Sequence, residues 1–127
     1  KYASYFDYFI TQAYTCTGEY TLNSRLNDLI NEYSSEVPAE ELARKLIVTE
    51  DFEKYAQMGG YDFIAPDGTE MKSLEGMARW NPVVNGKKIR KGGVGTYHME
   101  YEFYVPGHEG TYPFLRNATR IMNPPVK

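Results

Sequence analysis

Cysteine is nearly absent from this sequence: Cys16 is the only one among 127 residues, so the chain can form no internal disulfide. Nothing therefore requires an oxidising compartment, and we expect a cytoplasmic or virion setting rather than a secreted one. The flanking segment QAYTCTGEY contains no histidine or basic residue that would activate the thiol. We expect Cys16 to be a quiet, partly buried thiol rather than a nucleophile.

Long apolar runs are also missing. No stretch approaches the roughly 18 or more consecutive apolar residues of a membrane span. The N-terminal segment YFDYFI is too short and too polar for the core of a signal peptide. The sequence therefore predicts no membrane partner.

Aromatic residues, by contrast, are abundant. Twelve Tyr, six Phe and one Trp make up 15% of the chain. Tyrosine combines a large apolar ring with a polar tip, so it suits half-buried surfaces and interfaces. Two interpretations stay open: contact with a partner, or a small domain that fills its core with amphipathic rings.

Charge is divided unevenly along the chain. Residues 1–63 hold eleven acidic and five basic side chains, whereas residues 64–127 hold six acidic and nine basic ones. Such asymmetry can guide a protein onto a partner or onto a copy of itself. With 42% apolar and 24% charged residues, the composition is that of an ordinary globular protein.

Helix signals dominate the first half. Residues 4–14 and residues 21–37 both repeat apolar side chains at the spacing of one helix face. Thr21 precedes the second stripe as an N-cap, and Pro38 occupies the first position of a third predicted helix. Residues 51–58 continue that helix or form a short fourth one.

Glycine and proline divide the second half, from residue 61 onward, into short segments typical of strands. Asn85-Gly86 is the strongest hairpin signal. Residues 95–105 alternate in a way that predicts a central strand whose core face carries Tyr97, Met99, Tyr101, Phe103 and Val105. We predict a single α+β domain over residues 1–127, with N-terminal helical segments followed by a small antiparallel sheet with a hairpin near residues 83–105.

The polar face of that expected strand carries His98, Glu100 and Glu102. A histidine and two carboxylates could supply the general acid and base of a small hydrolase acting on nucleic acid, with Arg116 and Arg120 stabilising a phosphorane-like charge. They could also ligate a metal, although Cβ atoms two residues apart on a strand are about 6 to 7 Å apart, which is loose for one ion. A solvated strand face is the favoured interpretation, and we predict no metal site.

Four cations lie within the segment GKKIRKGGVG, namely Lys87, Lys88, Arg90 and Lys91. Together with Arg116 they are the predicted binding residues. They could attract the phosphates of a nucleic acid, contact an acidic protein, or only protect an edge strand. The glycines form no phosphate-binding loop, because no Gly-Lys-Ser/Thr follows.

Two segments, GVGTYHMEYEFYVPGHEGTYPFLRNATR and IAPDGTEMKSLEG, carry a family resemblance. The first contains a Gly-Thr strand, an aromatic-acidic strand and a last helix opened by Pro113, Phe114, Leu115 and Arg116. The second contains, in order, Ala65-Pro66, Asp67, Thr69 and Leu74. In these features the chain resembles the small neck proteins of tailed bacteriophages, the tail-completion or head-tail joining family. The resemblance implies a non-catalytic ring subunit that packs against copies of itself and against portal or tail proteins.

Two hypotheses follow. The favoured one is a non-catalytic structural or adaptor subunit of a larger assembly, because the tyrosine content and the charge asymmetry suit protein contacts. It predicts protein partners, including copies of itself, with nucleic acid less favoured, and no cofactor. The alternative is the small acid-base hydrolase with His98 and Glu100 or Glu102. A third interpretation, binding of a small molecule or sugar in an aromatic-lined groove, rests on the tyrosines alone.

Overall fold

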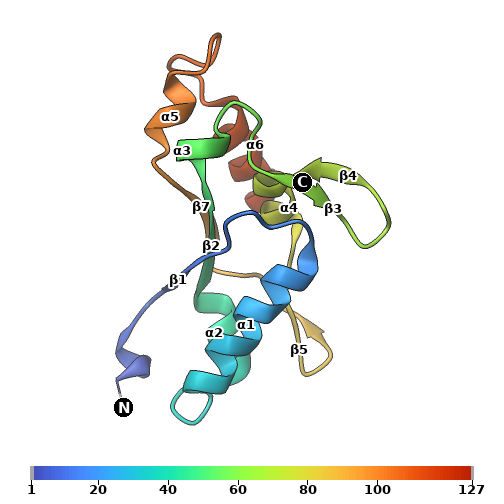
Figure 1. Ribbon diagram of the computed structural model, residues 1–127. Helices are drawn as coiled ribbons and strands as arrows, with labels where there is room; N and C mark the ends of the chain where they lie inside the picture. The colour runs from blue at the N-terminus through green and yellow to red at the C-terminus, as the bar shows by residue number, and fades with distance from the viewer. Residues whose placement is uncertain (1, 127) are drawn as a thin grey trace.

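The computed structural model describes residues 2–126, and its central element is a three-stranded parallel sheet (Figure 1). Its strands are β1 (Phe9–Gln12), β2 (Leu46–Asp51) and β7 (Gly93–Tyr97), in the order β1-β2-β7. Ile47 of β2 pairs with Ile10 on one side and with Gly93 on the other. The three strands therefore lie side by side in the order in which they occur in the chain.

Helices and two small hairpins fill the connections between these strands. After a 3-10 turn at Ala3–Tyr5, α1 (Glu19–Tyr33) and α2 (Ala39–Lys45) lead from β1 to β2. The longer path from β2 to β7 contains α3 (Phe52–Tyr55), β3 (Asp62–Ile64), β4 (Glu70–Lys72), α4 (Ser73–Arg79), β5 (Val83–Val84) and β6 (Lys87–Lys88). Two helices follow β7, namely α5 (Glu100–Phe103) and α6 (Pro113–Met122).

The main core lies on one face of the sheet. Leu46 and Val48 of β2 pack in one buried cluster with Leu22 and Leu26 of α1 and with Met77 of α4. In Figure 1 the helices α1, α2, α4 and α6 all lie on this side of the sheet. This packing makes three consecutive strand and helix units with their helices on the same side.

The opposite face of the sheet is not covered by any described helix. A Cβ atom at Gly93 would lie 3.6 Å from Cγ1 of Ile47, and one at Gly95 would lie 3.4 Å from Cγ2 of Thr49, so these four residues share this face. Ile10, in register with Ile47, is 71% exposed. Parallel sheets normally have both faces covered, so this face is an unusual surface for a parallel sheet.

The α+β class predicted from the sequence is confirmed, and so are several of its elements. The stripe predicted over residues 21–37 forms α1, and the predicted turn at Asn85-Gly86 joins β5 to β6. Asn85 and Gly86 have φ angles of 52° and 74°, as a two-residue type I′ turn requires. Cys16 is fully buried, and burial raises its pKa to about 11.

The helix predicted over residues 4–14 is wrong, because this segment forms the 3-10 turn and β1. A short apolar run fits either structure, and pairing with β2 decides in favour of the strand. The central sheet is consequently parallel, whereas we predicted an antiparallel one. Antiparallel pairing occurs only in the two hairpins among residues 2–126.

The long strand predicted over residues 95–105 is also wrong. Strand β7 ends at Tyr97, His98 adopts a left-handed φ of 57°, and α5 follows. Glu102 of α5 and Val105, two residues after the end of this helix, are the buried side chains here. The members of the predicted core face are mostly exposed instead: Tyr97, Met99, Tyr101 and Phe103.

Close packing of α4 against β3 leads to a stability prediction. A Cβ atom at Gly76 would lie 2.5 Å from Cδ1 of the buried Phe63 ring. We expect Gly76→Ala to lower the free energy of unfolding by about 1 to 3 kcal/mol in urea denaturation, although alanine favours a helix by about 1 kcal/mol. In a Phe63→Leu background the same change should be nearly neutral, and an equal loss in both backgrounds would contradict the proposed clash.

Candidate functional site

The carboxyl ends of the three parallel strands meet at one edge of the sheet, at the top of Figure 1. Parallel sheets place binding and catalytic groups at this edge, because the loops that follow the strands converge there. The polar and aromatic residues at the ends of the strands or directly after them are Gln12, Tyr14, Glu50, Asp51, Tyr97 and His98. We call this group the carboxyl edge.

Aromatic rings line the carboxyl edge in a continuous row. The rings of Tyr14, in the loop after β1, and Tyr97, the last residue of β7, have their centroids 6.2 Å apart. The centroid of the His98 ring lies 4.0 Å from that of Tyr97 and 5.6 Å from that of Tyr101. Because Tyr97 and Tyr101 are each about half exposed, the row is accessible to a ligand.

The Tyr14 hydroxyl remains a donor in this environment. Partial burial raises its pKa above the ordinary value of 10.0, and the nearby charges of Asp51 and Tyr97 raise it further. The phenol therefore keeps its proton through neutral and mildly alkaline pH. Tyr14 thus presents both an apolar ring and a hydrogen-bond donor at the edge.

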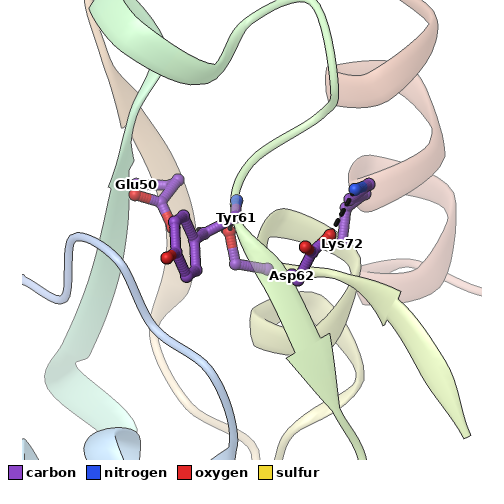
Figure 2. Close-up of polar contacts among 5 residues, drawn as sticks. Glu50, Tyr61, Asp62 and Lys72 are labelled. Carbon is purple, nitrogen blue, oxygen red and sulfur yellow. Dashed lines mark hydrogen bonds and ion pairs between the residues drawn. The ribbon is translucent and has the colours of Figure 1, made fainter.

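Glu50 lies beneath this edge as a fully buried carboxylate. Its Oε1 accepts hydrogen bonds from the backbone N–H of Asp51 at 2.8 Å and of Thr15 at 3.3 Å. Its Oε2 accepts one from the hydroxyl of Ser73 at 2.5 Å. In Figure 2, Glu50 projects from β2 toward the segment that carries Tyr61, while Lys72 and Asp62 pair across the β3–β4 hairpin.

The neighbouring carboxylates at this edge also have defined partners. Oδ1 of Asp51 accepts a hydrogen bond from the backbone N–H of Glu53 at 3.0 Å and so caps α3. The exposed Glu100 lies 2.6 Å from Nδ1 of His98, and this hydrogen bond lowers the pKa of Glu100. The edge therefore has fixed polar groups around its aromatic row.

Comparison with known proteins gives the family. The family model described as glycoside hydrolase family 18, BT1044-like, matches residues 1–121. The chain belongs to this family. Two chains of solved structures match it, and one is a selenomethionine form of BT1044 with a glutamate-to-glutamine substitution.

That BT1044 structure is 28% identical to this family 18 chain, with a TM-score of 0.69. The match covers 95% of this chain and 34% of BT1044, so the chain spans about a third of that protein's length. No curated protein gives a significant match.

Membership of family 18 overturns the functional predictions from the sequence. The resemblance to phage neck proteins is wrong, and with it the structural or adaptor subunit and its place in a virion. The Gly-Thr and Pro-Phe-Leu-Arg motifs belong to β7 and to the start of α6, where any strand and helix unit can carry them. The alternative, a hydrolase acting on nucleic acid, is also wrong, because family 18 acts on glycosidic bonds.

The three residues proposed as a catalytic face do not lie together. His98 and Glu100 are paired at the carboxyl edge, but Glu102 is buried on the inner side of α5. The carboxylate of Glu102 accepts hydrogen bonds from the backbone N–H of Phe114 at 2.7 Å and of Leu115 at 3.3 Å. It therefore stabilises the amino end of α6, where a negative charge is favourable.

The predicted basic residues lie outside the carboxyl edge. Lys91, just before β7, is buried and donates to the carbonyl oxygens of Ala78 at 3.0 Å and of Trp80 at 2.5 Å. Burial, followed by the charge of Arg90, lowers the Lys91 pKa to about 8. Arg90 donates to the carbonyl oxygen of Met122 at 2.6 Å at the end of α6. Both cations thus stabilise helix ends.

The other predicted binding residues remain on the surface. Lys87 lies 3.6 Å from Glu40 of α2, and Lys88 is exposed beside it on the hairpin. Arg116 is exposed on α6. Among residues 2–126, no cluster of three histidine, cysteine or acidic side chains is suited to a metal ion. None of the helices in this range is long and apolar enough to cross a membrane.

Sequence reasoning missed Tyr14, Glu50 and Asp51. The signal was present in LIVTED, where an apolar run typical of a buried parallel strand ends in two acidic residues. We assigned its first residues to a helix, so its carboxyl end was not recognised as a site.

Titration of Glu50 leads to a pH prediction. Burial raises its pKa above 4.5, so the native state binds this proton more tightly than the unfolded chain does. The resulting stability is fully present below the unfolded pKa and is lost as pH rises through the native pKa. Glu50→Gln cannot titrate, so the unfolding free energy of wild type minus variant should increase when pH falls from about 8 to about 5. Denaturation at several pH values would measure this difference, and a constant difference would contradict the raised pKa.

Proposed function

We propose that this chain forms the substrate-binding wall of a glycoside hydrolase, with a glycan bound along the carboxyl edge. The row formed by Tyr14, Tyr97, His98 and Tyr101 is the observation that supports this proposal most directly. Ligand sites combine aromatic surface with a few fixed polar groups, and here the Tyr14 hydroxyl and the His98–Glu100 pair supply them. A sugar offers both apolar C–H faces and hydroxyl groups to such a surface.

The sheet is, in this proposal, part of a (β/α)8 barrel. Its strands follow one another in order and its helices lie on one side, which is the arrangement of barrel strands with their outer helices. The uncovered face with Ile10, Ile47 and Thr49 then faces the barrel interior. The 34% coverage of BT1044 agrees with three strand and helix units of about eight.

The chain contributes substrate binding rather than the acid that cleaves the bond. Glycoside hydrolysis requires a carboxylic acid that protonates the leaving oxygen. Glu50 is fully buried with three donors, and Asp51 caps α3. Glu100 is paired with His98. We therefore assign the general acid to a strand other than β1, β2 and β7.

Tyr14 provides the test of this proposal. Tyr14→Phe removes the donor but keeps the ring, so we expect oligosaccharide affinity to fall about 5- to 10-fold. Tyr14→Ala also removes the stacking surface and should weaken binding further, to about 100-fold in total. Isothermal titration calorimetry with a panel of soluble oligosaccharides would measure both changes.

Tyr20 supplies the matched control, because it lies on α1 and is 87% exposed. Tyr20→Ala should leave the affinity unchanged. The proposal would be refuted if both Tyr14 variants bound oligosaccharides as tightly as the wild type, or if the wild type bound none of the panel.

A further inference from the structure

We propose that Glu50 is a positioning residue: its buried carboxylate holds three separate segments in the arrangement that presents the carboxyl edge to a glycan. This inference rests on the function proposed above. The segments are the loop after β1, the end of β2 and the start of α4 with the loop before β3. They are far apart in sequence; Glu50 binds Thr15, Asp51 and Ser73 directly, and the loop before β3 through Ser73.

The carboxylate suits this role because it only accepts hydrogen bonds. Two backbone N–H groups and one hydroxyl point at it, from Thr15, Asp51 and Ser73. The Ser73 oxygen in turn accepts a hydrogen bond from the backbone N–H of Tyr61 at 2.8 Å, which extends the network to the loop before β3. Hydrogen bonds to an ionised acceptor are about twice as strong as neutral ones.

The backbone groups held by Glu50 belong to the carboxyl edge itself. Thr15 follows Tyr14, so its N–H fixes the peptide plane that joins these two residues. Thr15 also has a left-handed φ of 56°, an uncommon conformation that the hydrogen bond to Glu50 supports. The N–H of Asp51 is fixed in the same way, and Asp51 is the residue that caps α3.

Tight packing keeps the network in one arrangement. A Cβ atom at Gly60 would lie only 2.1 Å from Oγ of Ser73, so the backbone there approaches the hydroxyl directly. Gly60 has a φ of 114°, which a residue with a side chain would rarely adopt. The serine hydroxyl therefore has little freedom to move away from Glu50.

Stability alone does not explain a carboxylate at this position, because burying its charge costs free energy. Within residues 2–126, no lysine, arginine or histidine pairs with Glu50. A buried charge without a counterion is unfavourable even when it is hydrogen bonded, and such features persist where function requires them. Because Glu50 binds the N–H groups of Thr15 and Asp51, next to the exposed row, we assign it the role of positioning these segments.

NMR of the backbone amides provides a direct test. In the wild type, the amide resonances of Thr15 and Asp51 should shift together as Glu50 titrates, and in Glu50→Gln this shared titration should disappear. Hydrogen exchange at these two amides should be at least about 10-fold faster in the variant, because an ionised acceptor is lost. Ser73→Ala, which keeps both backbone hydrogen bonds, should accelerate exchange less and provides the test if Glu50→Gln does not fold.

Affinity for oligosaccharides is measured on the same variants. Glu50→Gln should weaken binding about 5-fold or more, and Ser73→Ala by a smaller factor, although neither residue touches the exposed row. Lys91→Met is the matched control, since it removes another buried charge with two hydrogen bonds at the opposite end of β7. It should lower stability but leave the affinity and the exchange at Thr15 and Asp51 unchanged.

Each outcome is decisive. Unchanged exchange at Thr15 and Asp51 in both variants would overturn the inference, as would an affinity loss of equal size in Lys91→Met. If the wild type binds the panel and the Glu50 and Ser73 variants bind equally well, the positioning role is refuted while the proposed function stands. If the wild type binds nothing but the amides respond as expected, the proposed function fails and only the organisation of the loops by Glu50 is supported.

Discussion

Parallel pairing of β2 with strands on both sides is the constraint on which this structure depends. Strand β2 pairs with β1 along one edge and with β7 along the other, so only its two faces are left for packing, and these have different environments. Leu46 and Val48 enter the core against the helices, whereas Ile47 and Thr49 lie on the uncovered face. The same alternation, continued to the end of the strand, buries Glu50 under the loops. Strand β2 thus contributes residues to the core, to the uncovered face and to the candidate site.

The buried charged side chains contact backbone groups at helix ends and in loops. Glu102 stabilises the start of α6, Lys91 binds carbonyl groups at the end of α4, and Glu50 collects N–H groups from converging loops. In each case a full charge meets the partial charges of unpaired backbone groups. A pattern of charges along the sequence does not reveal this use, because the backbone partners belong to distant segments.

The sequence predicted local structure better than it predicted pairing. The stripe of α1 and the Asn85-Gly86 turn depend on neighbouring residues, and both were predicted correctly. Strand β1 was mistaken for a helix because its identity depends on β2, more than thirty residues away. The alternation in residues 95–105 suggested a strand, but the chain turns at His98 after β7 and forms α5 instead. The site was missed for the same reason: parallel strand ends meet only after the sheet forms.

Gly93 and Gly95 would leave space beside β7 in the interior of the proposed barrel. Barrel interiors are built in layers of side chains from alternate strands. On the uncovered face β7 contributes only hydrogen atoms at these two positions, whereas β2 contributes Ile47 and Thr49. In the proposed barrel, β7 would place no side chain at these two positions, so side chains from other strands would have to fill the space beside it. The smallest residues of this chain would thus determine where the rest of such a barrel needs bulky side chains.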